Sequence, residues 1–298
     1  MKKIFSFLLL TMFLTTTSSA FSQVSFGSQP DPSTGKDAII SSTNPTTYYG
    51  SNPELVIKAW GTDIMRSLIQ FDLSAIPTNV GIESATIFLS GSSSSVMTPS
   101  GNSCPPIGST TSNPLWVERI TQNWQESTVD WNNQPLTDIT DRAVITQSTS
   151  NFDWYYYIPN SYSLINMVQN MVTNPSNNNG FMLKLQNENG SRNTFFESSD
   201  YSGPNPEKFR PSIRVTYSIP EFTYCFNSSN SQEYTFTSGF YASDHCSHIW
   251  TIDGTQVSED PYFTLTLSSG THQVCHTITY LGYYHEYTTS KCITICVY

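Results

Sequence analysis

The chain has 298 residues, which is enough for two domains with buried cores. Its apolar content of 37% and aromatic content of 13% are too high for a disordered chain, although charged residues make up only 12%. The formal net charge of −10 argues against a nucleic-acid partner or an anionic membrane surface, because both require a basic face.

The first 22 residues have the pattern of a secretory signal peptide. Lys2 and Lys3 form a basic start, an apolar run covers residues 4–14, and small residues continue to Ser22. The apolar run is too short to span a bilayer, and no later segment is long enough. We therefore expect a secreted protein, extracellular or at the cell surface, with no membrane span. In such an oxidising compartment cysteines can pair.

Residues 23–218 alternate between apolar and polar side chains over short runs that are bounded by Gly, Pro, Asn or Ser. The expected strands are 54–58, 67–71, 85–89, 181–185 and 212–217. Segment 161–172 differs, because its apolar residues recur at helical spacing between a candidate N-cap at Ser161 and Pro175 beyond its end. This pattern predicts a β-sandwich capped by one short helix.

The composition changes near Pro220. All five histidines and five of the six cysteines follow residue 218. The β pattern continues, and the expected strands are 234–236, 248–252, 263–267, 273–278 and 293–297, with Asp253-Gly254 as a turn. About 80 residues suit a small immunoglobulin-like sandwich. We expect a second domain over 219–298, joined to the first through the linker residue Pro220.

Several motifs of the first domain occur in the order typical of one family. They are DAII (37–40), YG (49–50), RSLIQFDLSAIP (66–77), IESAT (82–86), WQESTVDWNNQP (124–135), NGF (179–181) and RPSIRVTY (210–217). Together they resemble the DNRLRE domain, which is also classed as carbohydrate-binding module family 96. The resemblance covers residues 27–217 and implies a jelly-roll β-sandwich. Members studied as carbohydrate-binding modules bind polysaccharide, including alginate, and the resemblance brings no catalytic residue.

The second domain is similar to a PKD-type domain. The motif WTIDG (250–254) stands where such domains have an aromatic strand and a turn, and GTHQVC (270–275) resembles a later strand. The resemblance implies an immunoglobulin-like sandwich, which we interpret as a spacer or adhesion module. The expected fold class is all-β, with a jelly-roll-like β-sandwich followed by a small immunoglobulin-like β-sandwich.

Catalytic groups are scarce in the first domain. It has no histidine and a single cysteine, Cys104, so neither a Ser-His-Asp nor a Cys-His nucleophile can be built within it. Glu118, Glu126 and Asp130 are conceivable as the paired carboxylates of a glycosidase. Glu126 and Asp130 fall in the Trp-containing motif, where hydrogen bonds to the backbone are the simpler role. We therefore expect no enzyme activity.

Sugar binding requires exposed aromatic rings beside hydrogen-bonding groups. In the segment DWYYYI (153–158), Tyr155 and Tyr157 face solvent if the alternate residues face the core. Tyr48, Tyr49 and Trp60 form a second candidate cluster. The alternative for each ring is ordinary packing in the core or on a sheet.

Asp31 and Asp37 are candidate ligands for Ca²⁺, since extracellular β-sandwiches often hold calcium through oxygen atoms. No ligand loop with fixed spacing surrounds them, and the alternative is that both are solvated loop acids. Ca²⁺ is the one cofactor that the sequence suggests.

In the second domain Cys292, Cys296, His272 and His276 invite a zinc site, but a secreted chain favours disulfides. Residues 275 and 292 come close if the strands around them form a hairpin. We therefore expect the disulfides Cys275–Cys292 and Cys225–Cys246.

The interpretation that follows is a secreted, non-catalytic protein whose first domain binds an extracellular polysaccharide. A neutral or weakly charged glycan is favoured, because an anionic one would be repelled unless Lys58, Lys184 or Arg192 formed a basic patch. The alternative is a structural surface, matrix or adhesion protein without a sugar site. A third interpretation is a polysaccharide-active enzyme. The sequence does not indicate an oligomeric state.

Overall fold

The computed structural model describes residues 23–91, 95, 97, 103, 112–149, 154–158, 161–218, 222–227, 230–239, 246–281 and 286–298, so the predicted signal peptide lies outside the described residues. The strands are β1 Gln23–Ser28, β2 Lys36–Ser41, β3 Glu54–Trp60, β4 Asp63–Gln70, β5 Gly81–Gly91, β6 Leu115–Ile120, β7 Thr137–Ile145, β8 Trp154–Ile158, β9 Phe181–Leu185, β10 Ser191–Glu197, β11 Ser212–Ser218, β12 Phe222–Asn227, β13 Asn230–Ser238, β14 Cys246–Ile252, β15 Thr255–Ser258, β16 Tyr262–Thr266, β17 Gly270–Leu281 and β18 Glu286–Val297. The helical elements are α1 Tyr162–Thr173 and the 3-10 turns η1 Pro175–Asn177 and η2 Pro206–Lys208.

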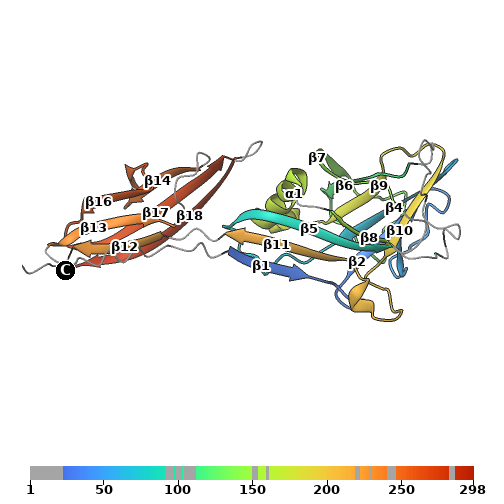
Figure 1. The fold of residues 1–298 in the computed structure, drawn as a ribbon, viewed down its shortest axis with the longest axis horizontal. Helices are drawn as coiled ribbons and strands as arrows, with labels where there is room; N and C mark the ends of the chain where they lie inside the picture. The colour runs from blue at the N-terminus through green and yellow to red at the C-terminus, as the bar shows by residue number, and fades with distance from the viewer. Residues whose placement is uncertain are drawn as a thin grey trace, which may run out of the picture.

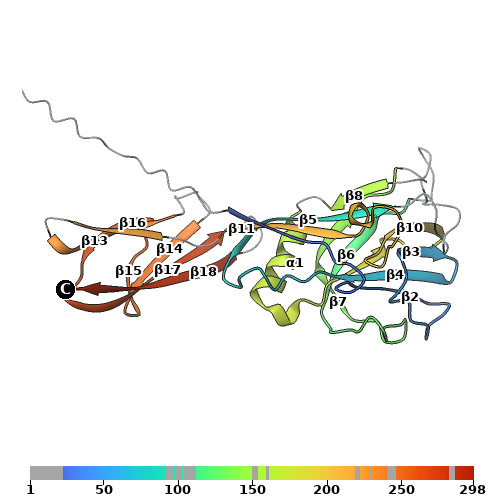
Figure 2. The same cartoon turned by 90° about the horizontal axis from the view of Figure 1, so that it is seen from below.

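Strands β1 to β11 form two antiparallel sheets that pack face to face (Figures 1 and 2). One sheet has the order β1-β11-β5-β8, and the other has β10-β3-β4-β9-β6-β7 with β2 paired to β4. Side chains of both sheets share one core. On β11, for example, Ile213 and Val215 are buried while Arg214 between them is exposed. The period of two places one side of each strand in the core, and the expected all-β sandwich is confirmed.

Helix α1 begins at the residue that the sequence predicts. The Ser161 hydroxyl accepts a hydrogen bond from the Leu164 backbone N–H at 3.2 Å, a cap of a kind that contributes about 1 kcal/mol. One face of the helix joins the core of the sandwich through Leu164, Met167, Val168, Met171 and Val172. Gln169 ties the helix to the start of β5, because its side chain accepts from the Ile82 N–H and donates to the Val80 carbonyl. The helix therefore covers part of the sandwich rather than standing apart.

Strands β12 to β18 form a second pair of sheets, ordered β12-β13-β16 and β15-β14-β17-β18. Their core is aromatic and centres on Trp250, whose indole N–H donates to the Asp260 carbonyl at 2.8 Å. The turn between β14 and β15 is built by Asp253 and Gly254, both with positive φ (52° and 80°), as a two-residue hairpin turn requires. The expected turn is therefore present.

The two pairs of sheets have separate cores and lie as two groups along the long axis of the molecule (Figure 1). The Thr289 hydroxyl of β18 donates to the Asn79 carbonyl, which precedes β5. The predicted linker residues 219–221 lie outside the described residues, and the division into 23–218 and 219–298 stays a prediction. No helix in the described ranges is long and apolar enough to cross a membrane.

Candidate functional site

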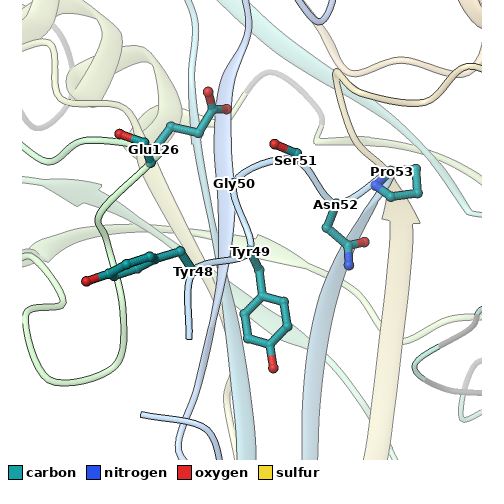
Figure 3. A pocket seen from close by; sticks show the side chains of 8 residues that line it. Tyr48, Tyr49, Gly50, Ser51, Asn52, Pro53 and Glu126 are labelled. Atoms are coloured by element: carbon teal, nitrogen blue, oxygen red, sulfur yellow. The ribbon is translucent and has the colours of Figure 1, made fainter. Parts of the chain in front are cut away.

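A cavity of about 470 Å³ lies between the loop 48–53 and residues Glu126 and Ser127 (Figure 3). The loop connects β2 to β3 and is held at both ends. Tyr49 forms a β-bridge with Ile39, and Asn52 accepts a hydrogen bond from the Glu54 N–H at 2.9 Å. The loop therefore stands on the edge of the larger sheet as a fixed wall of the cavity.

Gly50 lets this loop approach the opposite wall. A Cβ atom at position 50 would lie 2.5 Å from both the Cγ atom and the backbone oxygen of Glu126, a distance that real Cβ atoms do not adopt. Only glycine fits there. The Tyr-Gly pair of the sequence therefore has a packing role: it closes the loop onto Glu126, while Tyr48 keeps 54% of its surface exposed beside the cavity.

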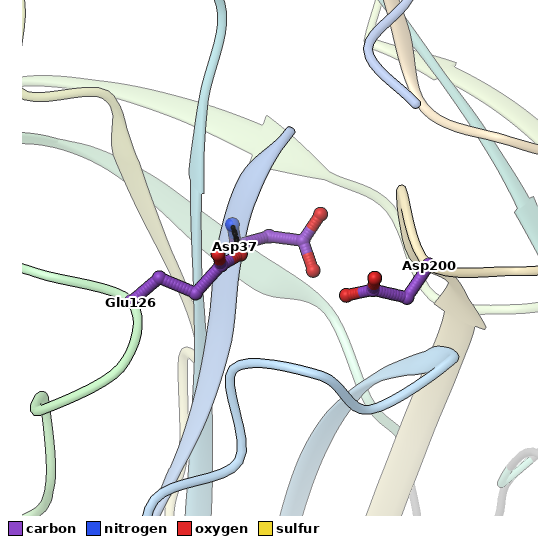
Figure 4. Close-up of side chains that lie close together, drawn as sticks. All are labelled: Asp37, Glu126 and Asp200. Atoms are coloured by element: carbon purple, nitrogen blue, oxygen red, sulfur yellow. Dashed lines mark hydrogen bonds between the residues drawn. The ribbon is translucent and has the colours of Figure 1, made fainter. Parts of the chain in front are cut away.

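Glu126 also belongs to a cluster of three carboxylates, with Asp37 at the start of β2 and Asp200 just after β10 (Figure 4). One carboxylate oxygen from each residue lies within 4.8 Å of the others. Glu126 Oε1 accepts a hydrogen bond from the Asp37 backbone N–H at 2.9 Å, and Asp37 Oδ2 accepts one from the Ser199 N–H at 2.9 Å. These contacts join segments that are far apart in the sequence.

The surroundings of the cluster disfavour negative charge. Burial raises the pKa of Asp37 to about 7; the adjacent Ser199 groups oppose this shift, and the charges of Asp200 and Glu126 add to it. Burial also raises the pKa values of Glu126 and Asp200. Lys36 and Arg210 act against these shifts, but burial lowers the pKa of Lys36 itself. Three clustered carboxylates are thus only partly compensated by nearby basic side chains.

The predicted aromatic cluster is divided by the structure. Tyr48 and Tyr49 line the cavity, whereas Trp60 lies at the opposite end of β3, roughly 20 Å away for a strand of this length. Trp60 is 60% exposed beside the tip of the β3–β4 hairpin, so it is a surface ring away from the cavity. Tyr155 and Tyr157 lie on β8, paired with Ser90 and Phe88, but their side chains lie outside the described residues. Their role in binding stays a prediction.

The expected calcium site with both Asp31 and Asp37 stays a prediction, and the structure places the two carboxylates in different surroundings. Asp31 Oδ1 accepts hydrogen bonds from the N–H and hydroxyl groups of Ser33 and Thr34 in an exposed turn, which lowers the pKa of Asp31 to about 2. Its carboxylate closes that turn and is not in the cluster around Asp37. Sequence reasoning missed Asp200, which carries no motif, and preferred a structural role for Glu126 over a catalytic one.

The other candidate carboxylates have structural partners. Glu118 is fully buried and forms ion pairs with Arg142 at 2.8 Å and with Lys184 at 3.0 Å. Asp130 Oδ1 accepts hydrogen bonds from the backbone N–H groups of Asn132 and Asn133, as expected for a residue that pins a loop. Both side chains therefore serve packing and turn formation.

Of the three residues that an anionic glycan would need as a basic patch, Lys58 and Lys184 are in ion pairs. Lys58 lies 2.5 Å from an oxygen of Asp63, and Lys184 shares the buried Glu118 with Arg142. Both lysines are thus engaged in ion pairs within the protein, which makes them less available to an anionic glycan.

One of the two expected disulfides is present in the structure, and the other is not. Cys275 and Cys292 stand opposite each other on β17 and β18 and are joined by a disulfide, as the hairpin predicts. The expected Cys225–Cys246 bond is wrong, because Cys225 is a free, exposed thiol on β12 and Cys246 begins β14 in the other sheet. The zinc alternative also fails, since the thiol of Cys292 is used and His276 faces the core.

Comparison with known proteins gave one family match. Residues 31–208, which contain the cavity and the carboxylate cluster, match the model of carbohydrate-binding module family 96. No curated protein matches the chain. Among solved structures, the chain is similar to a chain from the tripod (BppUct-A-L) of the baseplate of bacteriophage Tuc2009, with 10% sequence identity and a TM-score of 0.16, covering 93% of this chain and 98% of that chain.

Proposed function

The chain belongs to carbohydrate-binding module family 96, and from this premise we propose that it is a secreted, non-catalytic protein whose N-terminal β-sandwich binds an extracellular polysaccharide at the cavity beside Tyr48. The observation that carries the proposal is the exposed Tyr48 ring at the cavity, inside the part of the chain that matches the family. The volume of about 470 Å³ falls within the range of roughly 300–1,000 Å³ that is usual for ligand pockets.

The chemistry of the cavity suits a sugar. A tyrosine ring offers an apolar face to the C–H groups of a pyranose, and its hydroxyl can hydrogen-bond a neighbouring ring at small entropic cost. Ser51, Asn52 and Ser127 add hydroxyl and amide groups along the rim. The loop is anchored before ligand arrives, which reduces the entropy lost on binding.

A neutral or weakly charged polysaccharide fits these charges better than an anionic one. Glu126 forms part of the cavity wall and stands beside Asp37 and Asp200. Lys58 and Lys184, which the sequence offered as a counter-patch, are in ion pairs, and Lys36, which acts on Glu126, lies over the Trp124 ring. An acidic glycan would therefore meet net repulsion at this wall.

Residues 219–298 serve, in this proposal, as a PKD-like, immunoglobulin-like spacer or adhesion module. The support is the pair of sheets β12–β18 with its own aromatic core around Trp250. Its outer surfaces carry rows of hydroxyl side chains, such as Thr277 opposite Ser290 and Thr279 opposite Thr288. Such a module would hold the sugar-binding sandwich away from an attachment point.

Affinity electrophoresis in gels that contain neutral or acidic polysaccharides tests the proposal. We expect Tyr48→Ala to lose most of the retardation seen with a neutral polysaccharide. Trp60→Ala is the matched control, because it removes a similarly exposed aromatic ring away from the cavity. Equal retardation of both variants and the wild type would move the site elsewhere, first to Tyr155 and Tyr157. A wild type that no polysaccharide retards would favour the structural alternative, and release of reducing ends would favour the enzyme.

A further inference from the structure

The carboxylate cluster has a second feature that points to a ligand, the hydroxyl of Ser199. Ser199 is 1% exposed, and its Oγ atom has no hydrogen-bond partner among the described residues. The hydroxyl lies close enough to the Asp37 carboxyl to oppose the rise of its pKa. Buried hydroxyl groups in folded proteins nearly always have a partner, and an Oγ atom beside Asp37 that makes no hydrogen bond of normal geometry has lone pairs available to a cation.

The backbone packs closely around the cluster on the side of Ser199. A Cβ atom at Gly35 would lie 2.1 Å from Ser199 Oγ and 2.9 Å from the Asp31 carbonyl oxygen. A Cβ atom at Gly50 would likewise lie too close to Glu126, 2.5 Å from its Cγ atom. Glycines at 35 and 50 thus permit the close approach of three segments, which arrive from β2, from the 124–135 motif and from the end of β10.

Asp37 is buried whereas Glu126 and Asp200 are partly exposed, so the charge of Asp37 is the one that most favours a partner. Buried carboxylates are stable in proteins when they are paired or when they coordinate a metal. Among the described basic side chains that act on the cluster, Lys36 lies with its Nζ atom 4.5 Å above the Trp124 ring, and Arg210 donates to the Tyr201 carbonyl. Neither forms an ion pair with the three carboxylates among the described contacts.

We propose that Asp37, Glu126 and Asp200 bind a calcium ion, with the Ser199 hydroxyl as a further oxygen ligand. The donors are all oxygen atoms, which selects a hard cation over zinc or copper. Calcium accepts six to eight oxygens in flexible geometry, whereas magnesium demands a near-ideal octahedron that residues from three separate segments do not readily form. The ion would bind at the base of the loop 48–53, because Glu126 belongs both to the cluster and to the cavity wall.

The test is a direct measurement of metal binding. The purified protein is treated with a chelator, dialysed, and titrated with CaCl₂ or MgCl₂ in a calorimeter, and its thermal unfolding is followed at each metal concentration. We expect one Ca²⁺ per chain with a dissociation constant of about 0.1–1 mM, as in other extracellular modules, and weaker binding of Mg²⁺. The melting temperature should rise with Ca²⁺, since the ion binds the folded state only.

Asp200→Asn and Glu126→Gln each remove one charge and retain an oxygen acceptor, and we expect each to weaken Ca²⁺ binding at least tenfold. Asp31→Asn is the matched control and should bind Ca²⁺ as the wild type does, because its carboxylate only closes a turn. Asp200 is the safer position if Glu126→Gln unfolds, since Glu126 also accepts a hydrogen bond from the Asp37 backbone. Absence of Ca²⁺ binding to the wild type at millimolar concentrations, or unchanged binding by Asp200→Asn, overturns the proposal. The measurement contains no polysaccharide, so its failure is distinct from failure of the proposed function.

Discussion

The imidazole of His276 lies flat against the indole of Trp250, with ring centroids 3.8 Å apart and an angle of 13° between the planes. His276 is fully buried and shares a hydrogen bond of 3.1 Å with His248, Nε2 to Nδ1. The stack places a titratable side chain in the middle of the aromatic core of β12–β18. The stability of this part of the protein is therefore coupled to pH.

We predict that these sheets lose stability as the pH falls below about 6.5. Burial lowers the pKa of His276 to about 3, and the neighbouring His248 lowers it further in the same direction. The unfolded chain takes up a proton near pH 6.5, whereas the folded chain does not. The free energy of unfolding thus decreases by up to about 1.4 kcal/mol for each pH unit between 6.5 and 3.

Thermal unfolding of wild type and His276→Phe between pH 7.5 and 4.5 checks this prediction, with the variant expected to be less sensitive to acid. His272→Gln is the control. The hydrogen bond to Asp253 raises the pKa of His272, so its contribution is present at low pH and is lost as the pH rises. The assignment to His276 is wrong if His272→Gln, rather than His276→Phe, flattens the pH profile.

Gly50→Ala is predicted to lower stability by about 1–3 kcal/mol and to weaken polysaccharide binding. The added methyl group would overlap the backbone of Glu126, so the loop 48–53 must move away from the cavity wall. Gly27→Ala serves as the control, since its nearest neighbour would be the Ile213 carbonyl oxygen at 3.9 Å, an ordinary contact. Urea unfolding measures the first effect and affinity electrophoresis the second. Equal stability of the two variants would contradict the packing role of Gly50.

The disulfide between Cys275 and Cys292 is predicted to stabilise the second pair of sheets by about 3 kcal/mol. It closes a segment with a sequence separation of 17 and so restricts the unfolded chain. The double variant Cys275→Ser/Cys292→Ser should unfold at lower temperature than the wild type. Cys225→Ser should not, because that thiol is free and exposed. Peptide mapping under non-reducing conditions identifies the pair, and a Cys225–Cys246 peptide would contradict the structure.

Glu118→Ala is predicted to destabilise the first sandwich by roughly 3 kcal/mol. The variant removes a fully buried carboxylate and leaves Arg142 and Lys184 without their shared partner. Asp138→Ala, which breaks the more exposed pair with Arg119, should cost less than about 1 kcal/mol. Chemical unfolding of the two variants measures both changes in the free energy of unfolding. A Glu118→Ala protein as stable as the wild type would show that the buried charge contributes nothing to folding.

The local pattern of the sequence by itself determined the elements of this protein. Strands 181–185 and 212–217, the Ser161 cap and the Asp253-Gly254 turn were all predictable, because alternation, capping and turn chemistry depend on residues a few positions apart. The Cys275–Cys292 pair was predictable for the same reason, since a single hairpin connects the two strands.

Only the tertiary structure decided the site. Asp37 meets Glu126 across 89 positions and Ser199 across 162, contacts that follow from sheet order and loop packing and leave no periodic trace in the sequence. Strand length separated Trp60 from Tyr48, although the two residues are near in sequence, because an extended strand carries its ends far apart. The packing of two sheets likewise kept Cys225 away from Cys246. Within a hairpin, residues that are near in sequence are also near in space, so their contacts can be predicted. Most other contacts in a sandwich join residues that are far apart in sequence, and only the folded structure reveals them.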